Sequence, residues 1–379
     1  MNDPGIYILR QGMRPFFLGA GLYAVVAMAI WLGMFSDVIA PPTAFDPVTW
    51  HGHEMLYGFI AAAVAGFLLT AIPNWTGRLP VRGRSLGLLA IAWLAGRIGV
   101  YTSETIGNLA AGLLDVSFLL LLSGLFVREI IAGKNWKNLL VVVPVALLAT
   151  ANIAIHGGMI GYWNDVTREA LIFGLFLILI LLSVIAGRVV PSFTRNWLKA
   201  RGATRLPTPF GLFDKASILS VVILLIILTL GNDTLSGWAA AIVSILHTIR
   251  LARWRGWQCT AEPLLWIMHV AYAWLPIGFG LLAVSFLTDY ISMAAALHAL
   301  TAGAMGTMIM AMMTRATLGH SGRELHANAL TTLSYILLTL AVISRVFGDS
   351  ELAYLVSGGL WIAAFGIFSV KFGPILVGK

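Results

Sequence analysis

Charged residues are scarce in this sequence. Asp, Glu, Lys and Arg together make up 11% of the 379 residues, whereas 59% of the residues are hydrophobic. Soluble chains carry about 25% charged residues, so the composition excludes a soluble domain of this size. It predicts an all-α integral membrane protein.

Cysteine is nearly absent, since Cys259 is the only one. A single cysteine excludes an internal disulfide, and there is no Cys-x-x-Cys-His motif for covalent haem attachment. Any haem bound by this chain would therefore be held non-covalently. A small-x-small cleavage motif is also missing after the first apolar run, which predicts a retained first span and no signal peptide.

Long loops are missing too, because only short polar segments separate the hydrophobic runs. A membrane-spanning helix needs about 20 mostly apolar residues. Twelve segments fit, and they predict one polytopic transmembrane domain over residues 1–379 without soluble appendages. The predicted spans are 16–35, 51–72, 85–101, 109–127, 138–159, 169–190, 212–230, 235–252, 263–287, 291–313, 328–347 and 352–372.

Basic residues concentrate on alternate loops. All Lys and Arg residues except Arg97, Arg168 and Arg345 lie on one predicted side of the membrane. By the positive-inside rule, both termini are predicted to be cytoplasmic. The net charge of +8 therefore indicates topology, and not nucleic-acid binding. The acidic loop residues lie on the opposite side: Asp37, Asp46, Glu104, Asp165, Asp233, Asp289, Asp349 and Glu351.

The inner ends of the second, sixth and tenth spans resemble one another. Gly66–Thr76 and Ala186–Thr194 share a Pro-polar-aromatic-Thr pattern, and Met312–Thr317 is a looser copy. Copies four spans apart favour three pseudo-repeated groups of four helices. The alternative is that membrane helices commonly end in proline or polar residues without any repeat.

Six of the eight histidines lie at predicted membrane depth. Imidazole in hydrocarbon costs free energy unless it is paired or bound to a metal, so these residues indicate functional sites. Four of them, His51, His53, His156 and His298, are predicted near the outer face. Imidazole suits copper, iron and zinc, and metal or haem ligation is favoured there over packing or proton relay.

His51 and His53 open the second span. Asp46-Pro47 just before them is a good helix start, because an acceptor at the N-cap is followed by proline at the first helical position. Residues two apart on a helix point about 200° apart. The two rings are therefore expected to serve different partners on opposite sides of the helix.

Small residues follow two of these histidines. The helix face of His51 continues through Gly58, and that of His298 continues through Thr301 and Gly306. Small side chains leave room for a flat group such as a porphyrin, or for a closely packed helix. Both interpretations are open.

Other polar residues at membrane depth are few. Glu54 is expected to orient a ligand or carry protons. Arg97 is expected either to pair with Asp115 or to meet a haem propionate, because arginine binds carboxylates in bidentate fashion. For His247 and His269 in the inner half, a second site and a packing role stand as equal alternatives.

Five motifs together resemble the NnrS protein family. They follow one another over nearly the whole chain: Trp50–Met55 (WHGHEM), Gly66–Gly77 (GFLLTAIPNWTG), His269–Pro276 (HVAYAWLP), His298–Gly303 (HALTAG) and Met313–His320 (MTRATLGH). The resemblance implies a bacterial inner-membrane protein that contains haem and copper and acts in the nitric oxide response and nitrosative-stress protection. It leaves open whether nitric oxide is only bound or is reduced by an oxidoreductase.

With this family in view, His51 and His298 are predicted to lie beside a haem b, with Arg97 as a further cofactor contact. A looser likeness to haem-copper oxidases rests on histidines in the second and tenth of twelve spans. The adjacent His-His pair of those oxidases is missing here, so their residue roles do not transfer.

His53 and His156 are predicted as copper ligands. Glu54 and Tyr57 are predicted as the catalytic groups, acting as proton donors or orienting groups if nitric oxide is reduced. The remaining predicted metal ligands are His269 and His320.

Two other function classes stay open. A secondary transporter with intramembrane histidines on a proton or substrate path fits twelve spans, although no pair of spans is clearly broken at the midplane. A sensory or assembly factor would dock a partner through the basic loop 191–215. No quinone or flavin motif is visible, so the electron donor is undefined.

Overall fold

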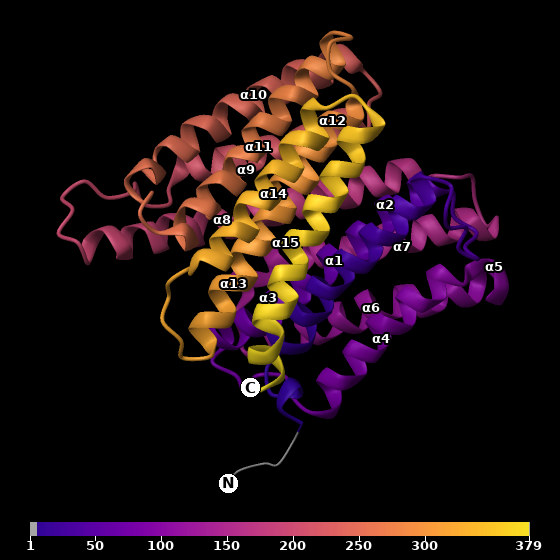
Figure 1. Cartoon of the computed structure of the whole chain (residues 1–379), viewed down its shortest axis with the longest axis horizontal. Helices are drawn as coiled ribbons and strands as arrows, with labels where there is room; N and C mark the ends of the chain where they lie inside the picture. Colours follow the sequence, from indigo (N-terminus) through magenta and orange to yellow (C-terminus); the bar gives the residue numbers. More distant parts are fainter. Residues whose placement is uncertain (1–5, 379) are drawn as a thin grey trace. The chain divides into compact units, whose positions relative to one another are not determined.

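The computed structural model describes residues 6–378, and the regular elements among these residues are all helices (Figure 1). Within this range, ten helices are long and apolar enough to cross a membrane. The protein is therefore an all-α, multi-pass membrane protein, as its composition predicts.

Each of the twelve predicted spans coincides with a helical segment. Ten segments are single helices: α1 (Met13–Phe35), α4 (Arg84–Tyr101), α6 (Asn108–Ala132), α7 (Leu139–Ile160), α8 (Thr167–Lys199), α9 (Leu212–Leu228), α10 (Asp233–Ala252), α11 (Pro263–Leu287), α14 (Ala329–Phe347) and α15 (Glu351–Val377). Two are composite: α2 (Pro47–His53), η2 (Glu54–Ile60) and α3 (Ala61–Thr76), and α12 (Met293–His298), η5 (Ala299–Gly306) and α13 (Thr307–His320). Short elements connect them: η1 (Tyr7–Leu9), α5 (Ser103–Ile106), η3 (Trp136–Asn138) and η4 (Gly256–Gln258).

Two of the predicted spans, α4 and α9, are not among the ten candidate membrane helices of the described range. Helix α9 has only 17 residues, which is short for a bilayer about 30 Å thick at a rise of 1.5 Å per residue. Helix α4 has 18 residues and includes Arg84 and Arg97. These two segments are therefore the weakest part of the twelve-span prediction.

The two composite segments each contain a π-helical stretch. The stretch η2 follows His53 directly, and η5 follows His298 directly. Single π turns inside α-helices occur frequently at functional sites. Two of the histidines predicted to bind a metal or haem therefore lie directly before an interruption of the regular α-helix.

The second span begins as the Asp46-Pro47 pair predicts. Asp46 Oδ1 accepts hydrogen bonds from the backbone N–H groups of Val48 and Thr49, both at 3.1 Å. The side chain thus satisfies two donors that the first helical turn leaves without a partner.

Replacing Asp46 by alanine is expected to lower the free energy of unfolding by about 1 kcal/mol, because those two N–H groups lose their acceptor. Asp46→Asn keeps an acceptor and is expected to have little effect. Thermal unfolding of the purified variants in one detergent measures both. Equal losses in the two variants would show that the cap does not stabilise the helix.

The helices pack into two compact units. The first unit runs up to Leu177 and includes the chain from Phe365 onward, and the second unit spans Ile178–Ala364. In the first unit, α1 packs on α3, and α6 contacts both α4 and α7. In the second, α11 contacts α10 and α13, and α10 contacts α9 (Figure 1). The single domain, the cytoplasmic termini and the threefold repeat stay predictions.

Candidate metal centre

Three buried side chains of the first unit meet at one place. His53 of α2, Asp115 of α6 and His156 of α7 each bring a possible ligand atom within 4.8 Å of the other two. Their exposed fractions are 0%, 2% and 3%. Asp115 Oδ2 lies 3.2 Å from His53 Nε2 and 2.9 Å from His156 Nε2. We call these three residues the histidine–aspartate cluster.

The local helix geometry separates His51 from His53, as their spacing predicts. The ring of His51 stacks on Trp31 of α1, with ring centroids 4.5 Å apart and planes 23° apart. The ring of His53 faces α6 and α7. Only His53 of the pair therefore belongs to the cluster.

Two glycines allow the helices around the cluster to approach closely. A Cβ atom added to Gly96 of α4 would lie 2.9 Å from the Cα of Asp115. A Cβ added to Gly112 of α6 would lie 3.1 Å from the ring of His156. Small residues at helix contacts let backbones come together, and here they bring α4, α6 and α7 to the cluster.

An ion-pair network surrounds the cluster. Arg97 Nη1 donates to Glu54 Oε1 at 2.5 Å, and Arg97 Nη2 donates to Asp115 Oδ1. Glu54 also accepts hydrogen bonds from His53 Nδ1 at 2.9 Å and from the hydroxyl of Tyr23. The pairing of Arg97 with Asp115, one of the two alternatives for this arginine, is thus present, and Arg97 holds two carboxylates in place.

The contacts of Asn152 determine what surrounds His53. Asn152 Nδ2 donates to Asp115 Oδ2 at 2.7 Å, so its Oδ1 is the atom that faces His53 Nε2 at 3.0 Å. His53 then has acceptors at both nitrogens, with Glu54 Oε1 at Nδ1. A neutral imidazole has one N–H and one lone pair. With its N–H donated to Glu54, neutral His53 has the lone pair of Nε2 facing an acceptor oxygen, and a cation bound at Nε2 would suit this arrangement.

The charges around the cluster lead to the same conclusion. Glu54 and Asp115 contribute two negative charges, and Arg97 contributes one positive charge. With neutral imidazoles the buried network has a net charge of about −1, and an uncompensated buried charge is costly. A bound metal cation would compensate it.

Aromatic rings cover the cluster. The ring of Phe45 lies 5.1 Å from that of His53 and 5.8 Å from that of His156. The ring of Tyr57 lies 4.7 Å from that of His53. The Tyr57 hydroxyl is buried and has no hydrogen-bond partner among residues 6–378. An unused donor therefore lies next to the cluster, at the residue predicted to supply protons.

The faces predicted to accept a porphyrin are filled by the chain itself. A Cβ added to Gly58 would overlap the ring of Tyr23, and a Cβ added to Gly306 would lie 2.7 Å from the ring of Trp361. The small residues thus serve close helix packing, which was the alternative interpretation. At these two faces the side chains do not fit a flat macrocycle.

His298 lies in the second unit and is half-buried. Its Nδ1 donates to the carbonyl oxygen of Ala294 at 2.7 Å. The lone pair of the neutral ring is then on Nε2, which is the arrangement that metal-binding histidines commonly adopt. Haem or metal ligation by His298 stays a prediction, as does the contact of Arg97 with a haem propionate.

The inner histidines lie in the second unit, outside the cluster. His247 Nε2 donates to the carbonyl of Ser217 at 2.9 Å, and its Nδ1 accepts from the hydroxyl of Tyr272 at 2.8 Å. Both nitrogens are therefore used, which favours the packing role. His269 Nε2 contacts Thr194 Oγ1 at 2.9 Å.

The other two predicted ligand positions differ in burial. His269 Nδ1 is buried and has no hydrogen-bond partner in the described part of the chain. His320 is exposed at the end of α13. Metal ligation by either residue stays a prediction.

Three contributors were not predicted from the sequence: Tyr23, Phe45 and Asn152. Asn152 precedes His156 by four residues, so the two lie on one helix face. A polar residue one turn from a histidine in an apolar span is a usable signal. No comparable pattern marks Tyr23 or Phe45.

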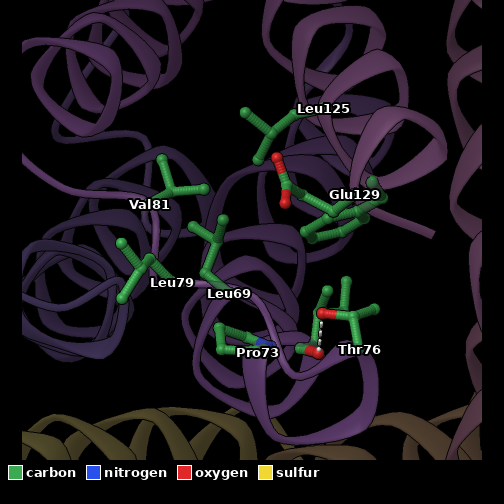
Figure 2. A pocket seen from close by; sticks show the side chains of 9 residues that line it. Leu69, Pro73, Thr76, Leu79, Val81, Leu125 and Glu129 are labelled. Carbon is green, nitrogen blue, oxygen red and sulfur yellow. Dashed lines mark hydrogen bonds between the residues drawn. The ribbon is translucent and has the colours of Figure 1, made fainter. Parts of the chain in front are cut away.

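A separate pocket lies between α3 and α6 of the first unit (Figure 2). Leu69, Pro73 and Leu125 contribute to its mainly apolar wall, and Glu129 supplies a carboxylate. The cluster residues do not line this pocket.

Comparison with known families gave one match. A family model described as NnrS protein matches residues 7–379, nearly the whole chain. A comparison with curated proteins gave no match. The matched range includes both units and the histidine–aspartate cluster.

Proposed function

Because the chain belongs to the NnrS family, whose members are membrane proteins related to the nitric oxide response, we propose that its histidine–aspartate cluster binds copper and that nitric oxide binds there. The observation that carries the proposal is the environment of His53. Acceptor oxygens of Glu54 and Asn152 face its two ring nitrogens. Its Nε2 and the Nε2 of His156 both lie close to Oδ2 of Asp115.

The donor set fits copper. Two imidazole nitrogens and one carboxylate oxygen suit copper and zinc better than magnesium or calcium. Glu54 on Nδ1 of His53 is the kind of outer carboxylate that orients a metal-binding histidine and fixes its tautomer. Arg97 would hold Glu54 and Asp115 in position.

Bound copper would supply a redox-active ion that binds a diatomic ligand. The protein's own groups would control that ligand. Phe45 would limit access of water, and the free hydroxyl of Tyr57 would donate a hydrogen bond beside His53. Glu54 would accept the hydrogen bond from His53 Nδ1, and the Tyr23 hydroxyl on its second oxygen would help to keep the carboxylate in place.

Reduction is the alternative to binding alone. Two nitric oxide molecules, two electrons and two protons give nitrous oxide and water, so reduction needs an external electron donor. Haem, implied by the family resemblance, enters no step of the proposal, because the two helix faces predicted to contact it are filled by side chains of the protein.

A bacterial inner-membrane location is part of the proposal.

The first experiment is metal analysis of protein purified in mild detergent, with visible spectra of the oxidised and dithionite-reduced sample. About one copper per chain is expected from the donor set. The electron paramagnetic resonance signal of copper(II) should change when nitric oxide is added. Formation of nitrous oxide with ascorbate as the reductant would indicate reduction. Protein without copper, or with zinc alone, would contradict the proposal. Reduced b-type bands would show that haem binds elsewhere in the chain.

Secondary transport is tested on the same preparation. A colourless, copper-free protein that moves metal ions or anions across proteoliposomes would assign the buried histidines to a transport path.

A further inference from the structure

A group of cationic residues lies in the second unit where α8, α9 and α10 meet. Arg250 of α10 is fully buried. Its Nε donates to Asp214 Oδ1 at 2.9 Å, and its Nη1 donates to Ser183 Oγ at 2.8 Å and to the Tyr272 hydroxyl at 2.9 Å. Arg250 is thus fixed at the end of α10 by one carboxylate and two hydroxyls.

That single carboxylate faces two guanidinium groups. Arg253 Nη1 lies 3.5 Å from Asp214 Oδ2, the oxygen that also accepts from the backbone N–H of Gly211 at 2.9 Å. Arg250 Nη2 and Arg253 Nη1 are buried and have no hydrogen-bond partner among residues 6–378. One positive charge of the pair therefore remains uncompensated at a costly position.

Further positive charge lies beside this pair. The Cζ atoms of Arg188 and Arg250 lie 5.7 and 6.0 Å from the ring centroid of Phe210. Lys215 is exposed on the first turn of α9, and the N-terminus of that helix adds its partial positive charge. We call Arg188, Lys215, Arg250 and Arg253 the basic cluster. Asp214 balances only one of its four charges.

Exposed apolar side chains adjoin the basic cluster. Phe210 is 37% exposed, and Leu212, the first residue of α9, is 82% exposed. Both lie at the ends of spans on the side that the positive-inside rule predicts to be cytoplasmic. Aromatic and apolar side chains next to arginines that outnumber the nearby carboxylates, at the end of a span, are typical of the membrane interface, where lipid headgroups meet the acyl chains.

We propose that the basic cluster binds the phosphate group of an anionic phospholipid from the inner leaflet. Arg188 and Arg253 contact the phosphate, and buried Arg250 adds attraction from below. Phe210 and Leu212 contact the start of the acyl chains. This site is independent of the copper proposal, because it lies in the second unit and needs no metal.

The test is native mass spectrometry of the full-length protein released from nanodiscs that contain phosphatidylglycerol and phosphatidylcholine. Wild-type protein is expected to retain phosphatidylglycerol preferentially. Arg253→Gln is expected to weaken retention roughly fivefold, the effect of one basic residue near an anionic surface. Arg205→Gln is the matched control, because it removes one charge from an exposed position between α8 and α9, on the same predicted side of the membrane but outside the basic cluster.

The outcomes separate the alternatives. Equal retention of both lipids by the wild type, or equal losses in Arg253→Gln and Arg205→Gln, would overturn the proposal. Displacement of the lipid by millimolar inorganic phosphate would show that a free anion is the ligand. Should Arg253→Gln fail to fold, Arg188→Gln at an exposed position replaces it, with the same fivefold loss expected.

Discussion

Replacing His53 by alanine is expected to empty the copper site, with at least a hundredfold loss of copper affinity. Loss of an outer partner of a metal ligand costs about 10- to 100-fold, and loss of the ligand itself should cost more. Copper bound per chain after equilibration with a competing chelator measures the effect. His156→Gln removes a second ligand of the cluster. It should disturb the ion-pair network of Arg97 less, because the polar contact of His156 among residues 6–378 is with Asp115.

The matched control is His51→Ala. It removes an imidazole two residues away in the same helix, where the ring stacks on Trp31 and does not belong to the histidine–aspartate cluster. Copper should stay bound in this variant. If His51→Ala lost as much copper as His53→Ala, the ligands would lie on the α1 side of the second span. If neither variant lost copper, the metal would bind outside the cluster.

Glu54→Gln separates ligand orientation from ligation. The glutamine amide oxygen can still accept the hydrogen bond from His53 Nδ1, but the substitution removes one negative charge beside Arg97. Copper affinity is expected to fall by about 10- to 100-fold, less than in His53→Ala. An affinity equal to wild type would mean that Glu54 does not orient the ligand.

The spans and the separation of His51 from His53 could be predicted because they are local. A run of about 20 apolar residues is sufficient to predict a membrane helix, and the 200° rotation between alternate residues follows from helix geometry. The Asp46 cap is local in the same way. Each of these features depends only on neighbouring residues, so one sequence is enough to predict it.

The partners of His53 could not be predicted, because they come from distant helices. Asp115 and Asn152 lie 62 and 99 residues further along the chain, and only the packing of α6 and α7 brings them to the ring. The sequence showed that Arg97 had two possible carboxylate partners but gave no means of choosing. The small residue Gly58 was equally ambiguous until the ring of Tyr23 was seen to cover it.

Replacing Arg97 by methionine is expected to destabilise the protein by about 3–5 kcal/mol, because two buried carboxylates lose their shared counterion. The exposed fractions of the side chains of Arg97, Glu54 and Asp115 are 4%, 1% and 1%, so water cannot take over its role. Thermal unfolding in one detergent and yield from the membrane fraction measure the loss. Adding Glu54→Gln should recover part of the stability, since one of the two uncompensated charges is then removed.

Arg78→Met gives the comparison that isolates burial. Arg78 also binds a carboxylate, Glu129 beside the pocket of Figure 2, at 2.5 Å. Its side chain is 43% exposed, however, and Arg128 contacts the same carboxylate at 2.7 Å. An exposed ion pair contributes about 1 kcal/mol or less to stability. The free energy of unfolding of this variant should therefore be close to that of the wild type. Equal destabilisation by Arg78→Met and Arg97→Met would mean that burial does not set the strength of the Arg97 network. The charge argument for a cation at His53 would then lose its physical basis.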